Sequence, residues 1–305
     1  MWNKSRNRKI KKILVTGCGG MLGNAVYPYL KSKGYDVLAT DIDLNANWLA
    51  KLDVREYDEA RKVAMKFRPD IILHLAALTS LEYCEDNLDD AHKTNFVGTV
   101  NMAKISKELD IPMVYISTAG VFDGKKSYYT EKDTPNPINV YGKTKLYAEI
   151  AVKNLLTKYF IIRAGWMVGG GKKDHKFVSY IVSQAKNGNK KFNVVNDKYG
   201  TPTYTQDFAK NMEALFNTEF YGLYHMVCSG HANRVDIAKY ILDLLDIKNY
   251  KMKEVSSDFF AKQFPIERPK YEILENSNLK VIKLNMMRPW KEAIRDYIND
   301  YFKND

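Results

Sequence analysis

The chain has 305 residues, with a hydrophobic content of 45% and a charged content of 27%, the proportions of an ordinary folded protein with a sizeable core. No apolar run approaches the roughly 20 residues that a membrane span needs, and no apolar stretch of signal-peptide length precedes the first predicted strand. The cysteines Cys18, Cys84 and Cys228 are odd in number and far apart. This pattern argues against a disulfide framework and predicts a cytoplasmic location.

The formal net charge of +11 raises the question of a nucleic-acid partner. Six basic residues lie within the first 12 positions, namely Lys4, Arg6, Arg8, Lys9, Lys11 and Lys12. The remaining basic residues are interspersed with acidic ones, and no basic-aromatic RNA or DNA module is present. We therefore expect solvated surface charge and no nucleic-acid or membrane partner. A basic surface would also attract an anionic nucleotide.

The first predicted strand, over residues 12–16, runs directly into a turn with glycines at three-residue intervals. A helical pattern begins at Met21, so backbone N–H groups and the positive end of the helix dipole point toward one place. Such a turn can hold a phosphate or a pyrophosphate. Gly17 permits the tight turn, Gly20 permits close approach of a ligand, and Gly23 permits close packing of helix on strand.

The first half of the chain continues as alternating strands and helices. Further strands are predicted over 35–40, 70–75, 112–117 and 159–163, and helices over 21–33, 56–67, 89–109 and 140–157. The strands are apolar on both faces, as a covered parallel sheet requires. The alternation predicts an α/β fold with a doubly wound parallel Rossmann sheet, in which ligands bind at the carboxyl ends of the strands.

After Arg163 this alternation is lost. We predict a helix over 175–187, a strand over 192–195, a turn-rich segment over 196–203, a helix over 205–216 and a strand over 222–228 that could return to the sheet. The chain beyond about 230 is predicted to be mostly helical, with a proline-containing loop at 265–269. The expected organisation is an NAD(P)-binding Rossmann domain over 1–168, with 196–228 returning to it, and a smaller substrate-binding lobe formed by 169–195 and 229–305.

Two carboxylates follow the glycine turn. Asp41 ends the second predicted strand, where it can accept hydrogen bonds from an adenosine ribose and would repel a 2′-phosphate. A helix cap or turn role is the alternative for Asp41. No arginine directly follows it, so NAD(H) is favoured over NADP(H). Asp53 lies just before the next helix, where it contacts adenine or caps that helix.

The third predicted strand ends in a histidine followed by small residues. A lone histidine at a strand end is more often structural than catalytic, so we assign no chemistry to His74. Ala76 and Ala77 would let the backbone of a cofactor pass close to the sheet. Asn95, in the following predicted helix, either supports a water path toward the site or lies on the helix surface.

A hydroxyl pair and a Tyr-x-x-x-Lys motif supply the expected chemistry. Ser117 and Thr118 end the fourth strand, and Tyr141 and Lys145 share one face of the next helix. A phenol is a poor acid–base group at neutral pH until a nearby cation favours its charged form. Lys145 can supply that cation, while Thr118 would hold a carbonyl oxygen as Tyr141 protonates it.

The candidate cofactor-binding residues are Gly17, Gly20, Met21, Leu22, Asp41, Asp53, Val54, Leu75, Ala76, Ala77, Tyr141 and Lys145. The expected cofactor is NAD(H) or NADP(H), and no metal site is predicted.

These motifs resemble those of the extended short-chain dehydrogenases/reductases. Within that superfamily the chain is most similar to the dTDP-4-dehydrorhamnose reductases. The similarity is carried by Gly-Met-Leu-Gly at 20–23, Tyr-Ile-Ser-Thr-Ala-Gly-Val-Phe-Asp-Gly at 115–124, Arg-Ala-Gly-Trp at 163–166, Asn-Asp-Lys-Tyr-Gly-Thr-Pro-Thr at 196–203, and Arg268-Pro269 followed by Leu-Glu-Asn-Ser-Asn-Leu at 274–279.

The resemblance implies a catalytic triad of Thr118, Tyr141 and Lys145. It implies that Trp166 lies near the sugar and Arg268 near the phosphates of the substrate. Ser117 and Thr203 complete the predicted substrate-binding set. A nucleotide sugar is the expected partner, and a homodimer is compatible with the sequence.

Two departures from the family pattern bear on specificity. The family usually has Asp-Tyr after the catalytic threonine, where this chain has Ala119-Gly120, and a serine three residues after its Arg-Pro, where this chain has Glu272. The expected function is NAD(P)H-dependent reduction of a nucleotide-linked 4-keto-6-deoxyhexose in deoxysugar biosynthesis. The alternatives are an NAD-dependent nucleotide-sugar 4-epimerase and a non-catalytic subunit like the regulatory partner of methionine adenosyltransferase.

Overall fold

The computed structural model describes residues 10–174 and 176–302. The basic residues before Ile10, and the predicted start of a helix at 175, lie outside the described residues.

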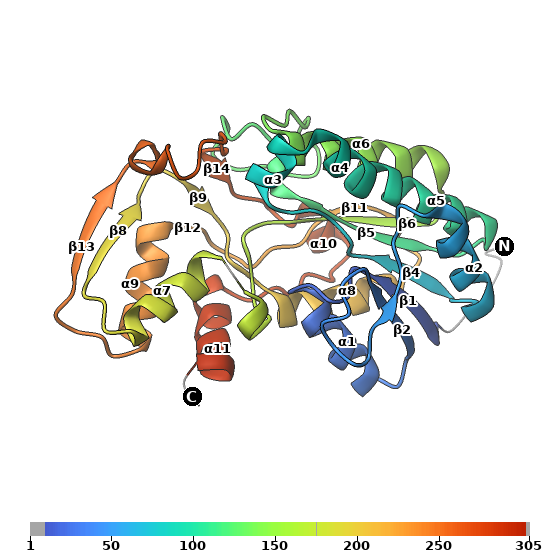
Figure 1. The fold of residues 1–305 in the computed structure, drawn as a ribbon, viewed down its shortest axis with the longest axis horizontal. Helices are drawn as coiled ribbons and strands as arrows, with labels where there is room; N and C mark the ends of the chain where they lie inside the picture. Colours follow the sequence, from blue (N-terminus) through green and yellow to red (C-terminus); the bar gives the residue numbers. More distant parts are fainter. Residues whose placement is uncertain (1–9, 175, 303–305) are drawn as a thin grey trace.

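One parallel sheet organises the larger part of the molecule (Figure 1). Its strand order is β11-β6-β5-β4-β1-β2-β3. The strands are β1 (Lys12–Thr16), β2 (Asp36–Asp41), β3 (Ala50–Lys51), β4 (Ile71–His74), β5 (Met113–Thr118), β6 (Tyr159–Ala164) and β11 (Gly222–His225). The order extends outward on both sides of β1 and β4, so the doubly wound sheet predicted from the sequence is confirmed. The strand predicted over 222–228 does return to the sheet, and it ends at His225.

Alternation along the strands divides the core into two layers. Ile13 and Val15 pack on one face with α1 (Gly23–Ser32) and α8 (Thr205–Phe216). Leu14, between them, packs on the opposite face. The helices on that face are α2 (Tyr57–Phe67), α5 (Gly98–Glu108) and α6 (Val140–Leu155). Both faces are therefore covered, as a parallel sheet requires.

The helix predicted over 89–109 is present over 88–108, but its hydrogen-bonding pattern changes along its length. It consists of α4 (Leu88–Ala91), a π-helical segment His92–Val97 and α5, and it is preceded by α3 (Leu81–Asp86), which was not predicted. The π-helical segment contains Asn95, which is fully buried. The surface interpretation of Asn95 was therefore wrong.

The second part of the chain forms small sheets and helices beside the main sheet (left in Figure 1). Its helices are α7 (Phe177–Lys186), α9 (Arg234–Leu244), α10 (Ser277–Val281) and α11 (Trp290–Phe302). β8 (Lys191–Val195) pairs with β13 (Lys251–Val255), β7 (Met167–Val168) with β10 (Thr203–Tyr204), and β9 (Tyr199–Gly200) with β12 (Ala232–Asn233) and β14 (Tyr271–Glu272). The expectation of a mostly helical chain beyond 230 missed β12, β13 and β14. Among the described residues, no helix is long and apolar enough to cross a membrane.

A buried ion pair fastens α6 to the sheet. Glu149 in α6 is 0% exposed and accepts hydrogen bonds from the Arg163 guanidinium of β6 at 2.8 and 2.7 Å. The Ser117 hydroxyl of β5 donates to the same carboxylate at 2.6 Å. Removing one member of a buried pair leaves the other charge uncompensated, which is costly. The pair therefore fixes the position of α6 across two strands.

Glu149→Gln should lower the free energy of unfolding by about 3–5 kcal/mol, because it leaves Arg163 buried without its counter-charge. Chemical denaturation measures this change. Glu254→Gln is the matched control, since Glu254 pairs with Lys239 on the surface with side-chain exposures of 47% and 53%. That variant should lose less than about 1 kcal/mol. Equal losses in the two variants would contradict a structural role for the buried pair.

Candidate functional site

A cavity of about 740 Å³ opens at the carboxyl ends of β1, β4 and β5 and reaches into the smaller sheets. Nearly all the site residues predicted from the sequence line it. These are Gly17, Gly20, Met21, Leu22, Asp41, Asp53, Val54, Leu75, Ala76, Ala77, Ser117, Thr118, Tyr141, Lys145, Trp166 and Arg268. Residues far apart in the chain thus meet around one space.

The glycine turn has the geometry of a phosphate cradle. Gly17 has a φ of +69°, and a Cβ there would lie 2.3 Å from the Ala76 backbone, so only glycine fits. Among the described residues, the backbone N–H groups of Met21 and Leu22 have no hydrogen-bond partner, although both residues line the cavity. No acidic residue lies in the first turn of α1. These free donors at a helix N-terminus fit the pyrophosphate of a dinucleotide.

Asp41 faces the glycine turn from the end of β2. One carboxylate oxygen accepts from the Gly19 backbone N–H at 2.8 Å, and the other accepts from Asp43 at 3.0 Å. The turn role considered for Asp41 is therefore present. Because Asp41 also lines the cavity, its remaining acceptor capacity is available to a ribose hydroxyl beside the turn.

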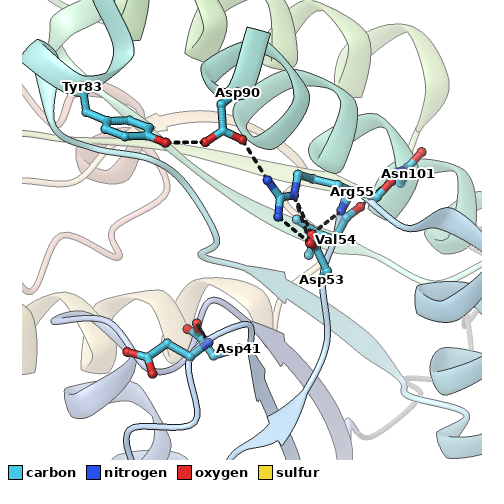
Figure 2. Close-up of polar contacts among 8 residues, drawn as sticks. Asp41, Asp53, Val54, Arg55, Tyr83, Asp90 and Asn101 are labelled. Carbon is cyan, nitrogen blue, oxygen red and sulfur yellow. Dashed lines mark hydrogen bonds and ion pairs between the residues drawn. The ribbon is translucent and has the colours of Figure 1, made fainter. Parts of the chain in front are cut away.

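Asp53 also lines the cavity, and its side chain belongs to a network of polar side chains (Figure 2). Its carboxylate receives hydrogen bonds from the backbone and guanidinium of Arg55, which hold the pKa of Asp53 below its usual value. Arg55 also pairs with Asp90 at 2.8 Å, and Tyr83 donates to Asp90 at 2.7 Å. Asp53 makes no cap on α2, so the helix-cap interpretation was wrong. The carboxylate is instead held ionised beside the cavity.

Two buried polar residues, His74 and Asn95, stabilise chain segments next to the cavity. The His74 ring lies between the hydroxyls of Thr16 and Thr99, at 2.7 and 3.0 Å, and burial lowers its pKa to about 3. His74 is thus a neutral structural residue, as expected. The Asn95 side chain bonds both backbone groups of Leu78, at 2.8 and 3.0 Å. Asn95 therefore fixes the loop after β4.

The reactive side chains gather where β5 and α6 meet. Asn139 caps α6 by accepting from Gly142 at 2.9 Å, which sets the start of the helix that carries Tyr141. Burial raises the pKa of the Tyr141 phenol to about 12, and a hydrogen bond with the Thr118 hydroxyl opposes that shift. The phenol is therefore protonated at neutral pH and can act as an acid.

Lys145 lies one helical turn after Tyr141. It is 3% exposed, and its ammonium lies 4.3 Å from the centre of the Tyr115 ring. Burial lowers the Lys145 pKa to about 7, while the nearby Glu149 carboxylate opposes that shift. Lys145 can consequently change its charge near neutral pH. A cation at this position would favour the phenolate of Tyr141.

The opposite end of the cavity is built around Trp166. This residue has a φ of +27°, a region that bulky residues rarely occupy. A Cβ on Gly200 would lie 2.4 Å from the indole, so the ring packs directly on the Gly200 backbone. The indole N–H donates to Glu272 at 2.8 Å, and the Arg234 guanidinium lies 4.6 Å from the centre of the Trp166 ring. Trp166 is therefore locked in place by its surroundings.

Several residues of this half were not predicted from the sequence. Arg234 and Lys176 line the cavity, but no motif marks them. Arg268 does line the cavity, yet its guanidinium already pairs with Glu82 and with the Ile266 carbonyl. Arg234 and Lys176 thus add their positive charges to that of Arg268 at this end of the cavity.

Two predicted substrate-binding hydroxyls are engaged elsewhere. The Ser117 hydroxyl donates to Glu149, and the residue is 3% exposed. Thr203 is 0% exposed, lies outside the cavity lining and donates to the Thr201 carbonyl at 3.1 Å. Ser117 nevertheless lines the cavity, and the substrate-binding roles of both residues stay predictions.

The Rossmann-like sheet, the glycine turn and the Tyr-x-x-x-Lys motif place the chain in the extended short-chain dehydrogenase/reductase class. The family profile of the RmlD substrate binding domain matches residues 11–303. The chain belongs to this family.

The names of individual relatives indicate different functions. The chain is 31% identical to a dTDP-4-dehydrorhamnose reductase from Bacillus anthracis solved in complex with NADP, with a TM-score of 0.88 over 95% of this chain and 99% of that one. It is 31% identical to the spore coat polysaccharide biosynthesis protein SpsK of Bacillus subtilis, covering 95% of this chain and 97% of that protein. It is also 28% identical to the methionine adenosyltransferase 2 subunit beta of Danio rerio, covering 94% and 90%.

The depressed pKa of Lys145 has a consequence for stability. Between about pH 7 and its ordinary value of 10.5, the unfolded chain holds a proton at this site that the folded chain has released. Stability should therefore rise with pH through that window. We expect the free energy of unfolding of the wild type, relative to Lys145→Met, to increase from pH 7 to pH 10 in chemical denaturation. A difference that stays constant or decreases would contradict the depressed pKa.

Proposed function

We propose that this protein is an NAD(P)H-dependent reductase of a nucleotide-linked 4-keto-6-deoxyhexose. The main support for this proposal is that Thr118, Tyr141 and Lys145 line the same cavity as the glycine turn. A relative of matching length is named dTDP-4-dehydrorhamnose reductase. The glycine turn and Asp41 would hold the dinucleotide, and the part formed by 169–195 and 229–305 would hold the nucleotide sugar.

The reaction assigns a role to each reactive side chain. A bound NADH or NADPH would supply the hydride to C4 of the sugar. Thr118 orients the carbonyl oxygen at C4, and Tyr141 gives its phenolic proton to that oxygen as negative charge develops on it. Lys145 stabilises the resulting phenolate, and the proton is later replaced from solvent. The high pKa of Tyr141 keeps the acid protonated until this step.

A second candidate function is that of a non-catalytic binding subunit. It is favoured by the 28% identity to the methionine adenosyltransferase 2 subunit beta. In that case the cavity would bind its ligand without turnover. The presence of Thr118, Tyr141 and Lys145 together favours catalysis.

Tyr141→Phe separates these two functions. It removes the proton donor while keeping the ring, so reductase activity should fall by about 10²- to 10⁴-fold. The assay follows oxidation of NADH or NADPH with dTDP-4-keto-6-deoxyglucose, with and without its 3,5-epimerase. The dissociation constant of the reduced cofactor should change little and serves as the folding control. A wild type that oxidises neither cofactor with any nucleotide 4-ketosugar would contradict the reductase proposal.

We also propose that NADH is the preferred cofactor, because the Asp41 carboxylate beside the glycine turn would repel a 2′-phosphate. Asp41→Asn should raise kcat/KM for NADPH relative to NADH by about tenfold, as expected for removal of one close like-charge contact. Asp53→Asn is the matched control, since an adenine contact is common to both cofactors and its loss should affect them alike. An unchanged ratio in Asp41→Asn would exclude Asp41 as the determinant.

A further inference from the structure

Glu272 occupies an unusual place for a carboxylate. It lies in the short strand β14 and lines the cavity together with the reactive Tyr141. Its negative charge contributes to the raised pKa of Tyr141, which places the two groups within electrostatic range. A methyl group added to Gly165 would lie 3.6 Å from the Glu272 carbonyl oxygen and 3.7 Å from the Ala119 methyl. The Glu272 backbone and the Ala119 side chain therefore both lie beside Gly165.

Gly120 leaves room beside the reacting groups. It lines the cavity and has no side chain, whereas Ala119 is buried and does not line the cavity. A Cβ on Gly120 would lie 3.4 Å from the Thr118 hydroxyl and 3.9 Å from the Tyr141 ring. A polar side chain at position 120 would thus sit next to both reacting residues. In this chain, polar recognition at that point has to come from another element.

One oxygen of Glu272 is committed and the other is open. Oε2 accepts the Trp166 indole N–H at 2.8 Å. Within the described part of the chain, Oε1 makes no hydrogen bond or ion pair, and it is not among the buried side-chain atoms left without a partner. It therefore has access to the cavity. Trp166 itself is fixed by packing on Gly200, so the direction of the open oxygen is fixed as well.

Three basic side chains lie near the Glu272 carboxylate and are engaged elsewhere. Burial raises the pKa of Glu272, while the Trp166 hydrogen bond and the charges of Arg234, Arg268 and Lys198 oppose that shift. Arg268 is already paired with Glu82, and Lys198 donates to the Arg268 carbonyl. The Arg234 guanidinium lies between the rings of Trp166 and Phe177, at 4.6 and 4.7 Å from their centres. Within the described residues, none of these cations forms an ion pair with Glu272.

From this arrangement we propose that Glu272 is a specificity-determining residue, whose open oxygen accepts a hydrogen bond from a hydroxyl or amino substituent of the sugar ring. The inference rests on the proposed function, since it assumes a nucleotide sugar in this half of the cavity. A carboxylate oxygen accepts but does not donate when ionised. A substrate carrying hydrogen at the matching ring carbon would leave the charge unpaired and would be rejected.

The test compares nucleotide 4-keto-6-deoxyhexoses that carry a hydroxyl, an amino group or hydrogen at C2 and, in a second series, at C3. At one of these carbons the wild type should prefer the donor-bearing sugar over the deoxy sugar by about 10- to 100-fold in kcat/KM. A preference for the amino sugar identifies an ammonium as the partner, and otherwise the partner is a hydroxyl.

Glu272→Gln should remove this preference. Its amide oxygen would accept the Trp166 N–H, so the amide NH₂ would meet the sugar donor with no acceptor. Glu275→Gln is the matched control, because Glu275 belongs to the same segment and pairs with Lys280 on the surface. That variant should keep the wild-type preference. A wild type without preference at either carbon, or a Glu272→Gln variant that binds NADH normally and keeps the preference, would overturn the inference.

A binding measurement separates this inference from the proposed function. Calorimetry with dTDP-glucose and its deoxy and amino analogues should show the same Glu272-dependent preference without turnover. If that preference is present but no ketosugar is reduced, only the reductase proposal fails. If ketosugars are reduced without a preference, only the role of Glu272 fails. If the protein binds no nucleotide sugar, both are overturned.

Discussion

The buried pair of Glu149 and Arg163 is the constraint on which the reactive geometry depends. Tyr141, Lys145 and Glu149 are four residues apart on α6 and therefore lie along one face of the helix. At the end of that face, the pair ties α6 to β6, and Ser117 ties it to β5. Thr118 follows Ser117 directly. The bonds of Glu149 therefore position both the Thr118 hydroxyl on β5 and the Tyr141 phenol on α6.

The same pair also sets the electrostatics of the site. Burial disfavours the ammonium of Lys145, and the Glu149 carboxylate one turn away partly restores it. Arg163 balances Glu149, which prevents that carboxylate from neutralising Lys145 by direct pairing. The result is a lysine whose pKa lies near neutrality beside a tyrosine whose pKa lies near 12. The buried ion pair thus influences the pKa of Lys145 in the cavity.

The sequence predicted which residues line the part of the cavity around the glycine turn, because the signals there are local. The turn at Gly17, the strand end at Asp41 and the four-residue spacing of Tyr141 and Lys145 each follow from short stretches of chain. The part of the cavity around Trp166 was predicted less well, because it is assembled from β7, β14 and the start of α9. Two-residue strands such as β12 and β14 carry no detectable alternation, so they could not be predicted.

The hydrogen-bond partners of side chains were the other feature that could not be predicted from the sequence. The position of Ser117 at the end of a strand was correctly inferred, whereas Thr203, predicted in a turn-rich segment, lies in the short strand β10. The bonds of their hydroxyls to Glu149 and to Thr201 appear only in the tertiary structure. Arg234 opens a helix without any motif, and its importance appears only when Trp166 and Phe177 are seen to flank it. Glu272 did stand out in the sequence as a departure. The structure adds that Trp166 holds it in place.

The most direct test of the account is the fate of hydride in the reaction. Purified protein is incubated with dTDP-4-keto-6-deoxyhexose and NADH carrying deuterium at both C4 positions of the nicotinamide, and the sugar product is examined by mass spectrometry and NMR. The account predicts one deuterium at C4 of the sugar for each NADH consumed. A sugar recovered without deuterium, or a changed sugar without net consumption of NADH, would contradict it.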